Sequence, residues 1–426
     1  MENVQVILIL VVFIAGIALM MTKKLPAILA LPLLGVLIAI IAGVPFMTPA
    51  KKDGQTIMAF VIAGGASKLA GTIMATIFGA IFAKVIQKQG ISDAIIRKAA
   101  ELAGDKPVVI AIVLTAATAL IFTAISGAGP VIMVSTIVIP LMLSAGIYPV
   151  VAASLVLFGL NIGLLFNVAN YQMYIDVIGM DIEVIKSTSV VMGLICIVVT
   201  LVYIFMKVNK KAVRSSWAMP AEGNGKKVNA VAMFTPLLPI ILVFFFKINA
   251  ETSLLIAIIV TTLITAPKQA VQILSSSVVE GIKDVSGVIA LMMGIGILLN
   301  GVSATATSAL MQPLISAVLP KTPVVYIILF TVLSPLALYR GPLNMYGLGS
   351  GLANIFLAAG TLSPVAVGMA LRGTSIVQTV SDPTNTQNVI VADYAKVDVN
   401  DILKSSLPYT MVMTFGVLVY TAIVLF

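Results

Sequence analysis

The sequence predicts an all-α polytopic membrane protein made of two inverted repeats. Each repeat is expected to hold about five transmembrane helices, including a re-entrant hairpin and a discontinuous helix. Three observations support this prediction: an apolar composition, long apolar runs from end to end, and a series of landmarks that recurs in both halves of the chain.

The composition is that of a membrane protein. Of the 426 residues, 60% are apolar and only 10% are charged, and the mean hydropathy is +1.15. Runs such as Val4–Met21, Val108–Ile125 and Ala230–Phe246 are each about as long as a helix that crosses the hydrocarbon core. Helices are expected because lipid offers no hydrogen-bond partners to an open backbone. The first run lacks a basic start and a cleavage site, so we interpret it as a retained helix rather than a signal peptide.

The residue inventory excludes several classes of function. The chain has no histidine, and Cys196 is its single cysteine, so we expect no zinc site, no internal disulfide and no cofactor. Neither a nucleophile with a base nor paired carboxylates are expected at membrane depth, which argues against an enzyme. The net charge of +9 is interpreted as the basic bias of cytoplasmic loops rather than as a nucleic-acid surface.

A polar stretch from Lys207 to Lys227 divides the chain into two halves. It is too polar to span a bilayer, so we predict a first repeat over 1–206, a linker over 207–228 and a second repeat over 229–426.

Five landmarks recur in the same order in the two halves, with offsets between 212 and 216 residues. They are Pro107 and Pro323, Gly129-Pro130 and Gly341-Pro342, Ala145-Gly146 and Ala359-Gly360, Pro149 and Pro364, and finally the polar segments 167–172 and 382–387. Internal repeats of this kind are a recurrent feature of secondary transporters.

The distribution of basic residues predicts the orientation. With five crossings per half and a cytoplasmic linker, the cytoplasmic side holds 17 of the 25 Lys and Arg residues and the outer side holds 5. An odd number of crossings per half makes the repeats inverted. We therefore expect a multi-pass protein of the cell inner membrane, with both termini outside and the lipid bilayer as its surroundings.

The Gly-Pro breaks are predicted to be the tips of re-entrant hairpins. The first break follows Ser126-Gly127, and the second lies in the segment from Tyr339 to Asn344, which includes Arg340. Gly and Pro interrupt a helix, and a break at membrane depth persists only where protein or a water-filled cavity satisfies the exposed backbone. Two kinks between ordinary packed helices are the alternative.

The segment at the end of each repeat carries a cluster of polar side chains. In the first half these are Asn161, Asn167 and Asn170, and in the second they include Thr374, Ser375, Asp382, Thr384 and Asn385. One such residue can simply bond a neighbouring helix, but a cluster at matched positions favours a discontinuous helix beside a binding site.

Charged side chains at membrane depth are candidates for function. The deepest ones predicted are Arg340, Arg372 and Asp382, while the other acidic residues are expected mostly in loops. A guanidinium matches a carboxylate with a planar fork of donors, so two arginines favour an anionic substrate. The alternative is a structural ion pair between Asp382 and one arginine.

With these features the chain resembles the ion transporter superfamily, which includes citrate, gluconate and C4-dicarboxylate carriers and divalent-anion/sodium symporters. The resemblance covers nearly the whole chain and rests on the hairpin segments Ser126-Gly127 and Gly341–Asn344 and on the broken segments 167–170 and 381–386. In that family, hairpin tips and unwound segments bind sodium and substrate carboxylates, and the resemblance also implies a homodimer. No Ser-Asn-Thr triplet occurs at either hairpin, which is a departure from the symporter pattern.

The predicted function is secondary active transport of a small organic anion, such as a dicarboxylate, a tricarboxylate or a sugar acid, by alternating access. Coupling to H⁺ or to Na⁺ is left open. Substrate is expected to contact Ser126, Gly127, Asn161, Asn167, Asn170, Arg340, Asn344, Arg372, Thr374, Ser375 and Asn385, and the coupling ion is expected at Ser126, Asn167, Asp382 and Thr384. The alternatives are a Na⁺/H⁺ antiporter of the same superfamily and the membrane subunit of a binding-protein-dependent carboxylate carrier.

Overall fold

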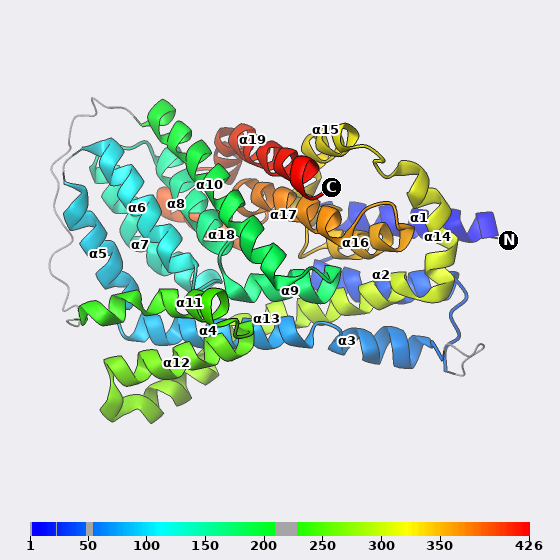
Figure 1. Ribbon diagram of the computed structural model, residues 1–426, viewed down its shortest axis with the longest axis horizontal. Coiled ribbons are helices and arrows are strands. Elements are labelled where there is room, and N and C mark those ends of the chain that lie inside the picture. Colours follow the sequence, from blue (N-terminus) through cyan, green and yellow to red (C-terminus); the bar gives the residue numbers. More distant parts are fainter. Residues whose placement is uncertain (1, 23, 48–53, 105, 209–227) are drawn as a thin grey trace.

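The computed structural model describes residues 2–22, 24–47, 54–104, 106–208 and 228–426 (Figure 1). Within these ranges every regular element is a helix and no strand occurs, which confirms the predicted all-α class. Six described helices are long and apolar enough to cross a membrane, or seven if one bent pair is counted as a single span. The chain is therefore a multi-pass membrane protein.

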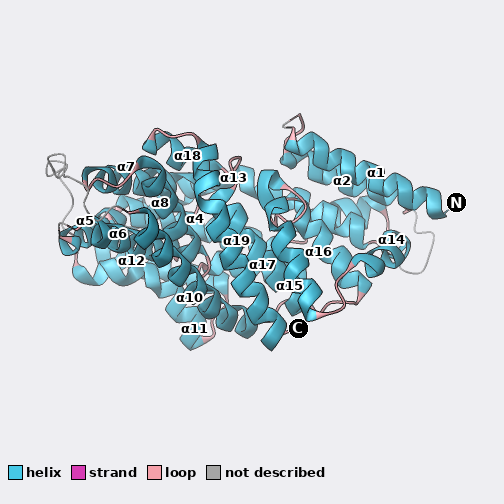
Figure 2. Cartoon of the chain, turned by 90° about the horizontal axis from the view of Figure 1, so that it is seen from above, coloured by secondary structure: helices cyan, strands magenta, loops and turns pink. Residues whose placement is uncertain are grey.

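The molecule is elongated, and its two ends are built from different helices. In both views α5, α6 and α7 lie at one end of the long axis, and α1, α2 and α14 lie at the other (Figures 1 and 2). The elements before the first hairpin are α1 (Glu2–Met21), α2 (Ala27–Ile41), the π-helix η1 (Ile57–Gly64), α3 (Gly65–Ser67), α4 (Ala70–Lys88) and α5 (Ile91–Ala103).

The first predicted hairpin and broken helix correspond to real breaks in the chain. The hairpin, called hairpin 1, consists of α6 (Pro107–Phe122), the turn 123–127 and α7 (Ala128–Ser144). The broken helix consists of α8 (Pro149–Leu164) and α9 (Val168–Ile178), which are bent by 62° relative to each other. The helix α10 (Ile182–Lys207) completes the first series.

The second half repeats this series. Hairpin 2 consists of α15 (Pro323–Leu333), η4 (Ser334–Arg340), a turn and α16 (Leu348–Ala359), and the broken helix consists of α17 (Pro364–Ser381) and α18 (Thr386–Ala395). The series ends with α19 (Val399–Val424). The prolines at the start of α6, α8, α15 and α17 occupy the first helical turn, where the missing N–H costs no hydrogen bond. The elements between the two series are η2 (Ala230–Leu237), α11 (Leu238–Phe246), α12 (Ala250–Thr265), η3 (Pro267–Gln269), α13 (Ala270–Ser303) and α14 (Thr305–Val318).

The two hairpins differ in where the Gly-Pro pair falls. Pro130 lies inside the first turn of α7, whereas Pro342 lies in the turn before α16. Residues 209–227 of the predicted linker lie outside the described residues, and the repeat boundaries and their inverted orientation stay predictions.

The first arms of the two broken helices form the centre of the molecule. Every residue of α8 from Val151 to Gly163 is buried, and most of α17 is buried as well. Gly159 permits the close approach of α8 to α6, because a Cβ there would lie 2.7 Å from the Thr115 carbonyl oxygen. Polar groups on α8 and α17 are consequently shielded from lipid by the surrounding helices.

The long helix α13 packs against α2, α3 and α4 through glycines. A Cβ at Gly35 on α2 would lie 2.6 Å from the Ile297 carbonyl oxygen, and a Cβ at Gly65 would lie 2.6 Å from Ile297 Cα. Gly296 contacts the Gly65 carbonyl oxygen in the same way. These backbone-to-backbone contacts fix the axial position of α13.

We predict that Gly296→Ala lowers the thermal unfolding midpoint, because its methyl group would collide with the Gly65 backbone, an overpacking that typically costs about 1–3 kcal/mol. The matched control is Gly287→Ala on the same helix, where a Cβ meets nothing within 4 Å. The control is expected to be neutral or slightly stabilising, since alanine favours the helix by up to about 1 kcal/mol. A thiol-reactive fluorogenic maleimide reports the midpoint, because Cys196 is the sole cysteine and is fully buried. Equal midpoints for the two variants would contradict the packing described above.

Candidate functional site

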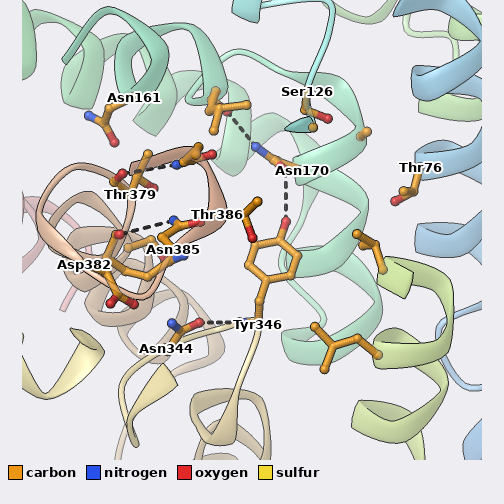
Figure 3. Close-up of a pocket in the computed structure, with 18 of the residues that line it drawn as sticks. Thr76, Ser126, Asn161, Asn170, Asn344, Tyr346, Thr379, Asp382, Asn385 and Thr386 are labelled. Atoms are coloured by element: carbon orange, nitrogen blue, oxygen red, sulfur yellow. Dashed lines mark hydrogen bonds between the residues drawn. The ribbon is translucent and has the colours of Figure 1, made fainter. Parts of the chain in front are cut away.

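A cavity of about 490 Å³ lies where the breaks of the two halves meet (Figure 3). Its walls come from the turn of hairpin 1, the α8–α9 break, α4, the middle of α13, the turn of hairpin 2 and the α17–α18 break. Interrupted helices border the cavity. Their exposed backbone groups and polar side chains make its wall more polar than the apolar surface of a continuous transmembrane helix.

Most of the residues predicted for the site do line this cavity. They are Ser126, Gly127, Asn161, Asn170, Arg340, Asn344, Arg372, Ser375, Asp382 and Asn385. Three others, Asn167, Thr374 and Thr384, lie beside the cavity rather than in its wall.

Asn167 and Thr374 each donate hydrogen bonds to the turn of a hairpin. The Asn167 amide donates to the carbonyl oxygens of Phe122 at 3.3 Å and Ile125 at 3.5 Å, at the turn of hairpin 1. The Thr374 hydroxyl donates to the Leu343 carbonyl at 3.0 Å, at the turn of hairpin 2. A side chain of each broken helix thus satisfies freed backbone carbonyls of the hairpin in its own half, which is the requirement for a break at membrane depth.

The turn of hairpin 2 carries an unusual backbone. Tyr339 and Arg340 both have a φ of 56°, a left-handed conformation that non-glycine residues seldom adopt. The Asn344 side chain stabilises the turn, accepting from the Tyr346 N–H at 2.9 Å and donating to the Ala337 carbonyl at 3.2 Å. Half-buried Arg340 lines the cavity and has neither a hydrogen bond nor an ion pair with any residue that the structure describes. Its guanidinium donors are therefore available.

Asp382 follows the last residue of α17 and is 1% exposed. Its carboxylate accepts from the Thr384 N–H at 2.9 Å and from the Thr384 hydroxyl at 2.7 Å. No described arginine lies within ion-pair distance of it, so the alternative of a structural Asp382–arginine pair is wrong for this conformation. Thr384 acts on the site through Asp382, whose orientation it fixes.

Arg372 is 3% exposed and is held by α10. Its guanidinium donates to the hydroxyls of Thr188 and of Ser189, the latter at 2.5 Å, and to the Ile185 carbonyl at 3.3 Å. It also lies 5.6 Å from the centre of the Tyr174 ring. Within the described part of the chain no carboxylate pairs with it, so this cavity-lining guanidinium is buried without a protein counter-ion.

Tyrosines, which the sequence analysis did not single out, connect the two halves across the cavity. The Tyr346 hydroxyl donates to Asn170 Oδ1 at 2.9 Å, and Figure 3 shows it pointing from the turn of hairpin 2 towards α9. The Tyr174 hydroxyl on α9 lies 3.2 Å from the Ser375 hydroxyl on α17. Aromatic residues in apolar helices suggest packing, so no sequence signal distinguished these two.

Asp284 also lines the cavity and was expected in a loop. That expectation is wrong because α13 continues without interruption from Ala270 to Ser303, with Asp284 near its middle. Asp284 was covered only by the general expectation that the other acidic residues lie mostly in loops. The structure instead places it on a long helix that carries ion pairs with α4.

No protein-family model matches the chain, and no curated protein matches its sequence. Solved structures do match it. The YdaH transporter of Alcanivorax borkumensis is similar with a TM-score of 0.63 and 15% identity, over 93% of this chain and 97% of that one. MtrF of Neisseria gonorrhoeae, from a class described as antimetabolite efflux pumps, is similar with a TM-score of 0.55 and 12% identity, over 93% and 94%.

The chain therefore shares the fold of these two proteins over nearly its whole length. At these identities the likeness is one of fold alone, and the resemblance to citrate- and dicarboxylate-type carriers stays a prediction. The fold and the cavity together define a multi-pass membrane protein with a polar site enclosed between two similar series of helices.

We predict that Tyr346→Phe destabilises the protein modestly, because it removes the hydroxyl that joins hairpin 2 to Asn170, a bond worth about 0.5–1.5 kcal/mol. The unfolding midpoint, followed by the reactivity of Cys196, is expected to fall. Tyr148→Phe serves as the control, since Tyr148 is 64% exposed. A Tyr346→Phe midpoint equal to that of the control would show that the hydroxyl bond contributes nothing.

Proposed function

We propose that this protein is a non-enzymatic secondary active transporter of a small organic anion. The observation that carries the proposal is Arg372, a buried, cavity-lining guanidinium without a carboxylate partner among the described residues. Isolated buried charge is costly, and the cost falls when an opposite charge binds beside it. A substrate carboxylate supplies that charge.

Arg340 strengthens the case for an anion. Its guanidinium lies in the wall of the same cavity, with its donors unused by the described protein. A guanidinium binds a carboxylate through two parallel N–H donors. Two arginines in one cavity suit a substrate with more than one acidic group, such as a dicarboxylate, a tricarboxylate or a sugar acid.

Neutral groups around the arginines would orient the substrate. Ser126, Asn161 and Asn170 come from the first half, and Asn344, Ser375 and Asn385 come from the second. Because both halves contribute, movement of one hairpin and its broken helix relative to the other would expose the site to one side of the membrane at a time. We propose that the two series are inverted repeats working by such alternating access.

The proposal also covers the location, orientation and oligomeric state of the protein. We place the protein in the inner membrane with both termini outside and the linker in the cytoplasm, and we propose a homodimer. The likeness to MtrF makes efflux a direction to test alongside uptake. A Na⁺/H⁺ antiporter and the membrane subunit of a binding-protein-dependent carrier are the competing functions.

We predict that at least one small carboxylate raises the unfolding midpoint of the purified protein. The panel is citrate, succinate, fumarate and gluconate, and a ligand present at 100 times its Kd stabilises the folded state by about 2.7 kcal/mol. Arg372→Gln and Arg340→Gln are expected to reduce the shift, because each removes charge that would face the substrate. Arg97→Gln is the control, since Arg97 is exposed on α5.

A shift of equal size in all three arginine variants would contradict the proposed role of the two cavity arginines. If sodium or pH moves the midpoint and no carboxylate does, the antiporter becomes the better interpretation. If a carboxylate binds only in the presence of a soluble partner, the binding-protein-dependent carrier is favoured.

We predict that Asp382→Asn abolishes any sodium-dependent part of this stabilisation. The asparagine keeps an oxygen that accepts from Thr384 but lacks the negative charge that would bind a coupling cation. The control is Asp393→Asn, because the Asp393 side chain is 75% exposed and lies outside the cavity. Sodium dependence that survives in Asp382→Asn would place the cation elsewhere, and a carboxylate shift that depends on pH alone would favour proton coupling.

A further inference from the structure

One of the residues that line the cavity, Asp284, belongs to an ion pair. Lys84 Nζ on α4 is 2.7 Å from Asp284 Oδ2 on α13, with the side chains 15% and 37% exposed. Asp284 lines the cavity, so its carboxylate can exchange protons with water there. Protonation would remove the charge on which the pair depends.

A second pair joins the same two helices one turn away. Lys88 Nζ is 2.7 Å from Glu280 Oε1, and neither residue lines the cavity. The helices also touch closely at Gly281, where a Cβ would lie 2.9 Å from the Ile81 nitrogen. The Lys84–Asp284 pair is therefore one of several interactions between α4 and α13.

The Lys84–Asp284 pair also contacts hairpin 1. At Gly129, in the first turn of α7, a Cβ would lie 3.3 Å from Asp284 Oδ2 and 3.8 Å from Lys84 Nζ. The free N–H groups at the start of a helix favour a neighbouring negative charge. The ionised Asp284 carboxylate therefore faces an ammonium group on one side and the start of α7 on the other.

The other charged groups near Asp284 are few. On α13 they are Glu280 and Lys283, on α4 they are Lys84 and Lys88, and α7 carries none. Arg340, Arg372 and Asp382 line the same cavity. Of these, only Lys84 forms an ion pair with Asp284 in the described structure.

We propose that Asp284 is a proton-coupling residue of the transporter. In its ionised form, paired with Lys84, it holds the start of α7 in the observed position. Protonation breaks the pair, removes the negative charge from the start of α7 and releases hairpin 1. The link to transport rests on the proposed function, whereas the pH-dependent hold on hairpin 1 does not.

Hydrogen–deuterium exchange of the full-length protein in detergent tests this hold directly, read by mass spectrometry on peptides that cover 123–131. At about pH 8, where a carboxylate is ordinarily ionised, Asp284→Asn mimics the protonated form and is expected to speed exchange about fivefold relative to the wild type. Comparing variants at one pH removes the intrinsic pH dependence of exchange.

Glu280→Gln is the matched control, because it breaks a pair of equal length between the same helices outside the cavity. Its exchange over 123–131 is expected to equal that of the wild type. The proposal is overturned if Asp284→Asn exchanges at the wild-type rate, or if Glu280→Gln accelerates exchange to the same extent.

Two further measurements guard against a variant that fails to fold. Lys84→Gln breaks the same pair from the other side and should also speed exchange, and the double variant should exchange no faster than either single one. Lowering the pH is expected to move wild-type exchange over 123–131, corrected for intrinsic exchange rates, towards that of Asp284→Asn, because protonation removes the carboxylate charge. Corrected wild-type exchange that stays constant down to the lowest pH at which the protein remains folded overturns the proposal without any mutation.

The role of Asp284 at hairpin 1 can be tested separately from the proposed anion transport. Wild-type protein is also mixed with each carboxylate of the panel, and protection of peptides around 340–346 and 372–385 reports anion binding. If hairpin 1 responds to pH and to Asp284→Asn but no carboxylate protects those peptides, anion transport fails while the hold by Asp284 stands. The opposite pattern removes Asp284 from the mechanism and leaves the anion site intact.

Discussion

The structure depends on how side-chain amides and hydroxyls satisfy backbone groups where helices are interrupted. A broken helix surrounded by apolar residues exposes carbonyl and N–H groups that lipid cannot pair. Asn167 and Thr374 donate to the carbonyls of the two hairpin turns, and Asn344 closes the second turn on itself. Without these bonds each break would leave several unpaired groups, at a cost of about 1–3 kcal/mol each.

The hydrogen bonds that satisfy the backbone at the helix breaks also bring the site residues together. Asn167 lies in the break that follows α8, and Thr374 lies within α17. Because α8 and α17 are largely buried, these bonds place both hairpin turns near the centre of the molecule. There Asn170, Asn344 and Asn385 line a common cavity. The hydroxyls of Tyr346 and Tyr174 then join the halves across it, so that a displacement of one half is transmitted to the other.

Much of this arrangement was predictable because its signals are local. Four of the recurring landmarks, Pro107, Pro149, Pro323 and Pro364, lie at the first positions of helices. The breaks occur at the two predicted polar segments, because proline and glycine act on their own backbone. The direction in which a side chain points was not predictable. Asn167 and Thr374 face the hairpins instead of the cavity, and Asp284 lies on an uninterrupted helix that brings it to the cavity. Those outcomes depend on tertiary contacts that sequence spacing does not encode.

The charges in and beside the cavity are kept apart rather than cancelled. Arg372 and Asp382 belong to the same broken helix, yet Arg372 bonds to hydroxyls of α10 and Asp382 bonds to Thr384. Asp284 is the exception, because Lys84 already balances it. A scaffold that needed these charges only for stability would gain more by pairing them or replacing them with apolar residues. Neutral partners fix the positions of Arg372 and Asp382 without neutralising their charges. This is the property expected of a binding site whose counter-ions come from solution.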